Sequence, residues 1–149
     1  MTGIIAASNA PMWRRSNMAE QGMNPEHFAR DDSSSDRRFY ETPRLVTHID
    51  DPACAALVEF YARVLPDGGE ILDLMSSCVS HLPVEVDYHS VTGLGMNEVE
   101  LMTNPQLTTA VIADLNEIPV LPFADAAFDG CVISVSIQYL IQPTEIFRE

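Results

Sequence analysis

The chain has 149 residues and a formal net charge of −14, with 22 acidic residues against eight arginines and no lysine. This length can bury one sizeable hydrophobic core, and 46% hydrophobic with 20% charged residues is typical of a globular domain. The negative charge argues against nucleic acid or an anionic membrane as a partner, because like charges repel. No apolar run approaches the roughly 20 residues of a membrane-spanning helix.

The first 38 residues differ from the rest of the chain. They show no hydrophobic periodicity and end in a polar run at 31–38. Such a composition buries little apolar surface, so residues 1–38 are predicted to be disordered and residues 39–149 to form the folded domain. The first 19 residues carry two arginines and no acid, which leaves organelle targeting open beside the cytoplasmic location that we expect.

A helix is predicted to begin near residue 50. Asp50 and Asp51 followed by Pro52 form a typical helix start, with an acidic N-cap and a proline in the first turn. Apolar residues then recur at intervals of three and four, as on one face of a helix: Leu57, Phe60, Tyr61, Val64 and Leu65. The Pro-Asp-Gly-Gly turn at 66–69 ends this helix, and we expect it to pack against a sheet.

Four strands are predicted from segments rich in β-branched and apolar residues without strict alternation: 71–74, 88–94, 108–115 and 130–136. This pattern is typical of strands covered on both faces, and hence of a parallel sheet. The second connection holds a short helix at 97–102, capped by Asn97. The predicted fold class is therefore α/β: a three-layer, Rossmann-like parallel sheet of about four strands with helices on both faces.

The segment 70–83 is predicted to organise the functional site. It reads as a strand that ends near Asp73, a tight loop of small residues, and one or two helical turns stopped by Pro83. In wound α/β sheets ligands bind at the carboxyl ends of strands, beside such loops. Ser80 and His81 have no nucleophile-elbow sequence around them and no acidic partner placed by the sequence, so no catalytic residue is predicted. The three cysteines and the histidines form no closely spaced pairs, so no metal site is predicted.

Three blocks of sequence carry a family resemblance: Glu-Ile-Leu-Asp-Leu at 70–74, Val-Thr-Gly-Leu-Gly-Met-Asn at 91–97, and Ala-Asp-Leu-Asn at 113–116 followed by Leu-Pro-Phe-Ala-Asp-Ala-Ala-Phe-Asp at 121–129. They resemble the class I (seven-stranded, type 11-like) S-adenosylmethionine-dependent methyltransferases. The resemblance covers residues 39–149 and implies the N-terminal part of a longer domain, with strands five to seven beyond residue 149. It implies methyl transfer from S-adenosylmethionine to a small-molecule acceptor that the sequence does not identify.

The resemblance also implies a cofactor site at the strand ends, with the candidates Asp73, Met75, Ser76, Ser77, Gly95, Met96, Asn97, Asp114, Leu115, Ser134 and Ser136. Asp73 is expected to orient the amino-acid end of the cofactor and Asp114 to meet the adenine amino group. Both carboxylates are expected at the ends of neighbouring strands, pointing into one cleft. The glycine loop of the family is degenerate here, with Met75, Ser77 and Val79 at its glycine positions, and the position of the ribose-binding acid falls on Gly95.

The sequence leaves two other functions open. The loss of the loop glycines and of the ribose acid favours a non-catalytic, methyltransferase-like module that binds a protein partner. A nicotinamide-dinucleotide domain needs a glycine loop for the pyrophosphate and a full helix behind it, and the sequence offers neither. The fourth predicted strand leaves an apolar edge, so we expect either further strands or a protein partner to cover it.

Overall fold

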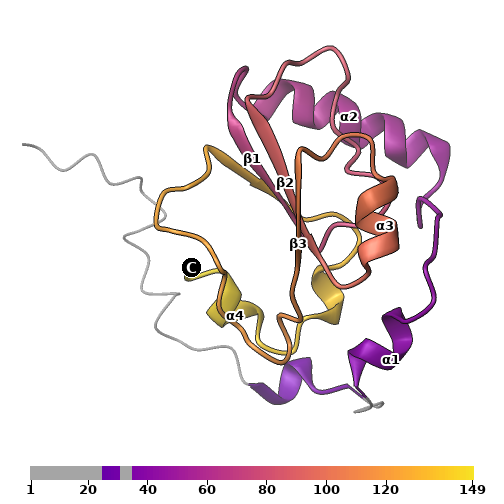
Figure 1. The fold of residues 1–149 in the computed structure, drawn as a ribbon, viewed down its shortest axis with the longest axis vertical. Helices are drawn as coiled ribbons and strands as arrows, with labels where there is room; N and C mark the ends of the chain where they lie inside the picture. Colours follow the sequence, from indigo (N-terminus) through magenta and orange to yellow (C-terminus); the bar gives the residue numbers. More distant parts are fainter. Residues whose placement is uncertain (1–24, 31–34) are drawn as a thin grey trace, which may run out of the picture.

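The computed structural model describes residues 25–30 and 35–149 (Figure 1). The predicted disorder falls mostly on residues 1–24 and 31–34, which lie outside the described residues. Regular structure begins before residue 39, with the 3-10 helix η3 (Pro25–Phe28) and the helix α1 (Asp36–Tyr40). Helix α1 has no buried residue and is held by polar contacts of Asp36 rather than by burial.

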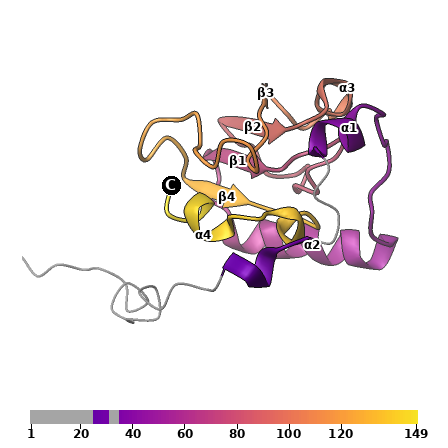
Figure 2. The same ribbon diagram turned by 90° about the horizontal axis from the view of Figure 1, so that it is seen from below.

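The four predicted strands form one sheet in which all neighbours are parallel. In chain order they are β1 (Glu70–Leu74), β2 (Ser90–Gly95), β3 (Thr109–Ile112) and β4 (Gly130–Val132). Their order across the sheet is β3-β2-β1-β4, as Figure 2 shows. Leu72 of β1 lies beside Thr92 of β2 on one side and Cys131 of β4 on the other. The predicted α/β, Rossmann-like fold class is thereby confirmed.

The third and fourth strands end earlier than the sequence indicates. After β3, Ala113 still donates to the carbonyl of Gly95 at 3.0 Å, but the Asp114 side chain then accepts from the backbone N–H of Asn116 and turns the chain. After β4, Val135 adopts a left-handed backbone with φ of 61°, which ends the extended conformation. Local turn formation therefore overrides the apolar pattern at both strand ends.

Helix α2 (Asp51–Val64) begins as predicted, with the Asp50 side chain accepting from the N–H of Ala53 at 2.9 Å. The predicted apolar face is confirmed only in part. Tyr61 is 5% exposed and packs with Ile71 and Val91 of the sheet, and Leu57 and Leu65 join this cluster. Phe60 and Val64, by contrast, are 48% and 53% exposed. The contact face of α2 is narrower than the apolar stripe.

Helices cover both faces of the sheet, as predicted. Ile71 packs with Tyr61 of α2, whereas the next residue, Leu72, packs in a second cluster with Ile146 of α4 (Pro143–Ile146). Successive strand residues point to opposite faces, so α2 and α4 lie on different sides of β1. The short helix α3 (Glu98–Thr103) contacts β2 and β3 and is capped by Asn97, as the sequence predicts.

The helical turns predicted after β1 are wrong, because residues 78–82 form no helix. Side chains of the loop after α3 bond the backbone of this segment instead. Gln106 accepts from the N–H of Ser80 at 3.2 Å and donates to the carbonyl of Leu82 at 2.7 Å. Asn104 donates to the carbonyl of Ser77 at 2.9 Å. These bonds satisfy backbone groups that a helix would have paired internally.

Within the described part of the chain, no helix is both long enough and apolar enough to cross a membrane.

Candidate functional site

Two cavities at the carboxyl end of the sheet are lined by residues at the end of β1, and a third, of about 410 Å³, adjoins the first of these two at Arg30 and Leu140. The larger of the two cavities at the β1 end, called the larger cavity below, has a volume of about 240 Å³ and is lined by residues at the ends of β1, β2 and β3. The smaller cavity, of about 40 Å³, is lined by residues at the ends of β1 and β4. Ligands of wound α/β proteins bind in the crevice at this end of the sheet, so both cavities are candidate sites.

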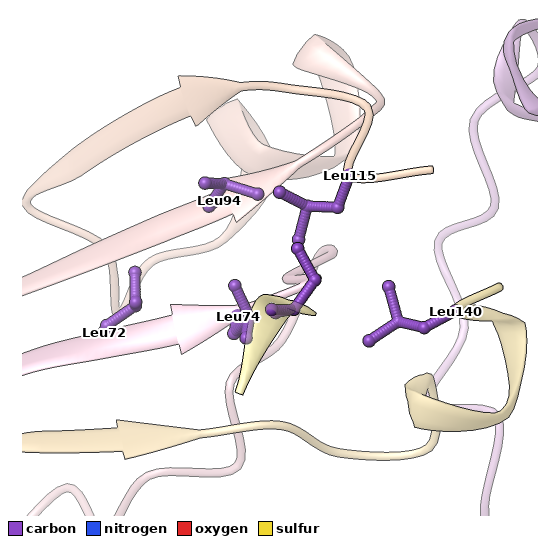
Figure 3. Packing of buried hydrophobic residues seen from close by; sticks show 6 residues of the cluster. Leu72, Leu74, Leu94, Leu115 and Leu140 are labelled. Atoms are coloured by element: carbon purple, nitrogen blue, oxygen red, sulfur yellow. The ribbon is translucent and has the colours of Figure 1, made fainter. Parts of the chain in front are cut away.

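The larger cavity has an apolar floor. Leu94, Leu115 and Leu140 line this cavity, and each is at most 4% exposed. Figure 3 shows these three side chains converging from β2, from the chain after β3 and from the chain after the 3-10 helix η4 (Ile137–Tyr139). The apolar floor with a few polar groups at the rim is the usual make-up of a small-molecule site.

Helix α1 forms the outer wall of the larger cavity, through Asp36, Phe39 and Tyr40. No residue of α1 is itself buried, so polar contacts attach this helix to the domain. Asp36 accepts hydrogen bonds from Arg30 at 2.5 Å and from Asn116 at 2.7 Å. The carbonyl of Tyr40 accepts from the Asn97 side chain at 2.6 Å.

Asp114 and Asn116 form the rim of the larger cavity beyond β3. Asp114 Oδ1 accepts from the N–H groups of Asn116 and Glu117, at 3.0 and 3.2 Å. Asn116 Nδ2 donates to Asp36 and to the carbonyl of Tyr139, and Asn116 Oδ1 accepts from the N–H of Ile141 at 2.9 Å. Asn116 therefore joins α1, the β3 end and the C-terminal segment at one point.

Asp73 lines the smaller cavity and is 4% exposed. Burial raises the pKa of its carboxyl to about 6, while side-chain hydrogen bonds from Ser76 and Ser80 act in the opposite direction. The Ser76 hydroxyl donates to Asp73 Oδ2 at 2.6 Å. The carboxylate is thus bonded within its own loop rather than directed at the larger cavity.

Several residues that line the smaller cavity have a left-handed backbone conformation. Among the described non-glycine residues, left-handed φ angles occur at four residues that line this cavity: His48 (63°), Met75 (58°), His81 (55°) and Val135 (61°). Burial lowers the pKa of His81. Ser134, also in the lining, shares a 2.6 Å hydrogen bond with the Tyr61 hydroxyl. Left-handed non-glycine residues are uncommon, and such strain gathers at sites that the surrounding structure holds rigidly.

The loop after β1 separates the two cavities. Met75 and Ser76 each line both cavities. The N–H of Ser76 donates to the carbonyl of Leu94 at 2.7 Å, which fixes the loop against the end of β2. A Cβ atom at Gly95 would lie 2.4 Å from the Ser76 carbonyl oxygen. This close approach explains the glycine at the position where the resemblance implies an acid.

The expectation that Asp73 and Asp114 meet in one cleft is wrong. Strand β2 lies between β1 and β3, so the two residues are not on neighbouring strands. Asp114 lines the larger cavity, and Asp73 lines the smaller one. Both residues are at the carboxyl end of the sheet, but the loop at Met75 and Ser76 stands between them.

The other candidates lie in several places. Gly95, Met96 and Leu115 line the larger cavity, as Asp114 does, and Met75 and Ser76 line both cavities. Ser77 and Ser134 line the smaller cavity. Asn97 and Ser136 line neither: Asn97 accepts from the N–H of Glu100 as the cap of α3, and the Ser136 hydroxyl donates to the carbonyl of Ser134.

Sequence reasoning missed the polar residues of the outer wall, Arg30 and Asp36, and the rim residues Asn116 and Tyr139. Arg30 and Asp36 stand in the part predicted to be disordered, and no local pattern marks them. Asn116 directly follows the quoted Asp114 and Leu115, and an amide after a strand end is the kind of signal that could have singled it out.

Comparison of the sequence with models of protein families and with curated proteins gives no match in either case.

Proposed function

We propose that the chain binds the adenosine part of a small molecule in the larger cavity, with S-adenosylmethionine as the cofactor and methyl transfer to a small acceptor as the activity. The observation that carries this proposal is the position of the cavity, at the carboxyl ends of β1, β2 and β3 with Asp114 and Leu115 in its wall. The sequence resemblance assigns Asp114 to the adenine amino group and names Leu115 among the cofactor-binding candidates. When bound, this cofactor supplies an activated methyl group.

The residues of the larger cavity fit an adenosine group. Leu94 and Leu115 offer an apolar surface to a base. At the rim, Asp114 Oδ1 accepts hydrogen bonds from the backbone N–H groups of Asn116 and Glu117. No hydrogen bond from the described residues reaches Asp114 Oδ2, so this oxygen can accept from the exocyclic amino group of adenine. The side chains of Phe39 and Tyr40 close the outer side. Stacking of a base on an aromatic side chain contributes about 1–3 kcal/mol.

The residues do not fit the amino-acid end of the cofactor equally well. Asp73, expected to meet that end, is directed into the smaller cavity and bonded to Ser76. This observation favours a second candidate function, a methyltransferase-like module that retains the adenosine site without catalysis.

Calorimetric titration of the whole chain with S-adenosylmethionine and with adenosine tests the proposal. We expect binding that is reduced at least tenfold by Ala113→Phe, which places a ring in the larger cavity. Ala110→Phe is the matched control, because Ala110 is an exposed residue of β3, the strand that Ala113 directly follows. Circular dichroism of each variant establishes that it is folded. Absence of binding to either compound, with the wild-type chain folded, would overturn the proposal.

A further inference from the structure

The third cavity, which adjoins the larger one, is formed by segments far apart in the sequence. Its volume of about 410 Å³ falls within the range of roughly 300–1,000 Å³ that is common for small-molecule sites. Helix η3 and the two residues after it line one side, and the chain from η4 to the end of α4 lines the other. Arg30 and Leu140 line both this adjoining cavity and the larger one, so a ligand of the adjoining cavity can reach the boundary between them.

The lining of the adjoining cavity is mainly apolar. Two of its large side chains are left exposed, Ile137 at 46% and Phe147 at 55%. The partly exposed Phe28 and the buried Leu140 and Pro143 complete the apolar part. Apolar surface that is gathered in a hollow favours a ligand that displaces water from it, and aromatic side chains pack well against an aromatic ring. The cavity therefore favours a ligand with an apolar, aromatic body.

The polar part of this lining is free of acids. The chain has 22 acidic residues, yet of those that the structure describes none lines the adjoining cavity. Its polar residues are His27, Arg30 and Gln138, all of which carry hydrogen-bond donors. Glu145 of α4 pairs with Arg148 at 2.6 Å and is not part of the lining. A cationic ligand would find no counter-charge here, whereas an anionic one meets Arg30.

Arg30 is held at the boundary between the two cavities with donors to spare. Its Nη1 donates to Asp36 at 2.5 Å, and Asp36 lines the larger cavity but not the adjoining one. Asp36 also accepts from Asn116 at 2.7 Å, so its charge is shared between two donors. Among the described residues, Asp36 is the one hydrogen-bond partner of the Arg30 side chain, and a guanidinium carries five N–H donors. The remaining donors can bind an anionic oxygen.

We infer that the adjoining cavity binds a small molecule with an apolar, aromatic body and one anionic oxygen group, the class of the aromatic monocarboxylates. The body lies against Phe28, Ile137 and Phe147, and the carboxylate lies at Arg30. None of the observations behind this site involves S-adenosylmethionine, so the site stands or falls separately from the proposed function.

Calorimetric titration of the whole chain with three probes of one ring system tests the charge preference. The probes are 2-naphthoate, 2-naphthalenemethanol and 2-naphthylmethylammonium. We expect 2-naphthoate to bind at least tenfold more tightly than either of the others. The net charge of −14 by itself favours the cation, so this order requires the local charge at Arg30. Equal or tighter binding of the ammonium probe, or no binding of 2-naphthoate to the folded chain, would overturn the inference.

Ile137→Asp locates the site, because Ile137 lines the adjoining cavity and not the larger one. An acid at this position repels a carboxylate, so we expect 2-naphthoate to bind at least tenfold more weakly. Ile118→Asp is the matched control, at a 64% exposed isoleucine that lines neither cavity, and should keep the affinity within threefold. Unchanged 2-naphthoate affinity in folded Ile137→Asp would overturn the inference.

Arg30→Gln examines the anionic end of the ligand. We expect the preference for 2-naphthoate over 2-naphthalenemethanol to fall from at least tenfold to threefold or less. Both probes are measured on the same variant, so any loosening of α1 after loss of the bond to Asp36 affects them alike. A preference that stays at tenfold would contradict the role of Arg30. Parallel titration with S-adenosylmethionine distinguishes failure of this site from failure of the proposed function.

Discussion

The carbonyl oxygen of Ser76 lies 2.4 Å from the point where a Cβ atom at Gly95 would be. This contact places the loop after β1 directly on the end of β2. This loop separates the two cavities, and the contact leaves no space for an acidic side chain at residue 95. The same contact therefore accounts for the glycine at residue 95 and for the division of the site.

Gly95→Ala should destabilise the domain through this contact, because the neighbour is a backbone atom that cannot turn aside. We expect a loss of roughly 1–3 kcal/mol in the free energy of unfolding, measured by urea denaturation. Gly130→Ala in β4 is the matched control: its nearest neighbours are side-chain ends of Leu65 and Ile71, at 2.9 and 3.2 Å, which can move. Equal losses in both variants would contradict the rigid contact at Ser76.

Asn116→Ala should loosen α1, because it removes the side chain that joins Asp36, Tyr139 and Ile141. Hydrogen bonds of this kind each contribute about 1 kcal/mol to stability, so we expect a loss of roughly 1–3 kcal/mol. Hydrogen exchange of residues 36–40 should become faster than in the wild type. Unchanged exchange in α1 would show that other contacts hold this helix. Gln138→Ala, at an exposed residue outside this network, serves as the control.

Asp73→Asn should stabilise the chain at neutral pH. The folded-state pKa of Asp73 is about 6, above its ordinary value of 3.8, because burial disfavours the charged form. The wild type therefore loses stability as the pH rises from about 4 to about 6, by an amount on the order of 3 kcal/mol. The variant lacks this loss, so the difference between the two proteins should be near zero below pH 4 and largest above pH 6.5. Urea denaturation across this pH range measures it, and a difference that does not change with pH would exclude the raised pKa.

Gln106→Ala should make residues 78–82, which follow the β1 loop, less ordered. Its side chain bonds the N–H of Ser80 and the carbonyl of Leu82, which have no helical partners. We expect a loss of about 1–2 kcal/mol and faster hydrogen exchange at residues 78–82. Gln142→Ala is a suitable control, because the Gln142 side chain makes no cap hydrogen bond. If exchange at 78–82 stays slow, backbone packing rather than Gln106 orders the segment.

The sequence alone determined the class of fold and most of its elements. Apolar runs without alternation predicted four parallel strands, and Asp50 and Asn97 predicted the starts of α2 and α3, because these signals depend on residues close together in the chain. It also indicated the carboxyl end of the sheet as the site, since ligands of parallel α/β sheets bind there. Six of its candidate residues line the larger cavity: Met75, Ser76, Gly95, Met96, Asp114 and Leu115.

Only the tertiary structure decided how that site is divided. Asp73 and Asp114 line different cavities because β2 lies between the strands that precede them. Local sequence patterns do not determine the order of strands in a sheet. The missing helix after β1 depends on Gln106, which lies some two dozen residues further along the chain. Asp36 reaches Asn116 across 80 residues of sequence. Each of these contacts joins distant segments, so the physical reason is the same: side-chain partners far apart in sequence are fixed only when the chain packs.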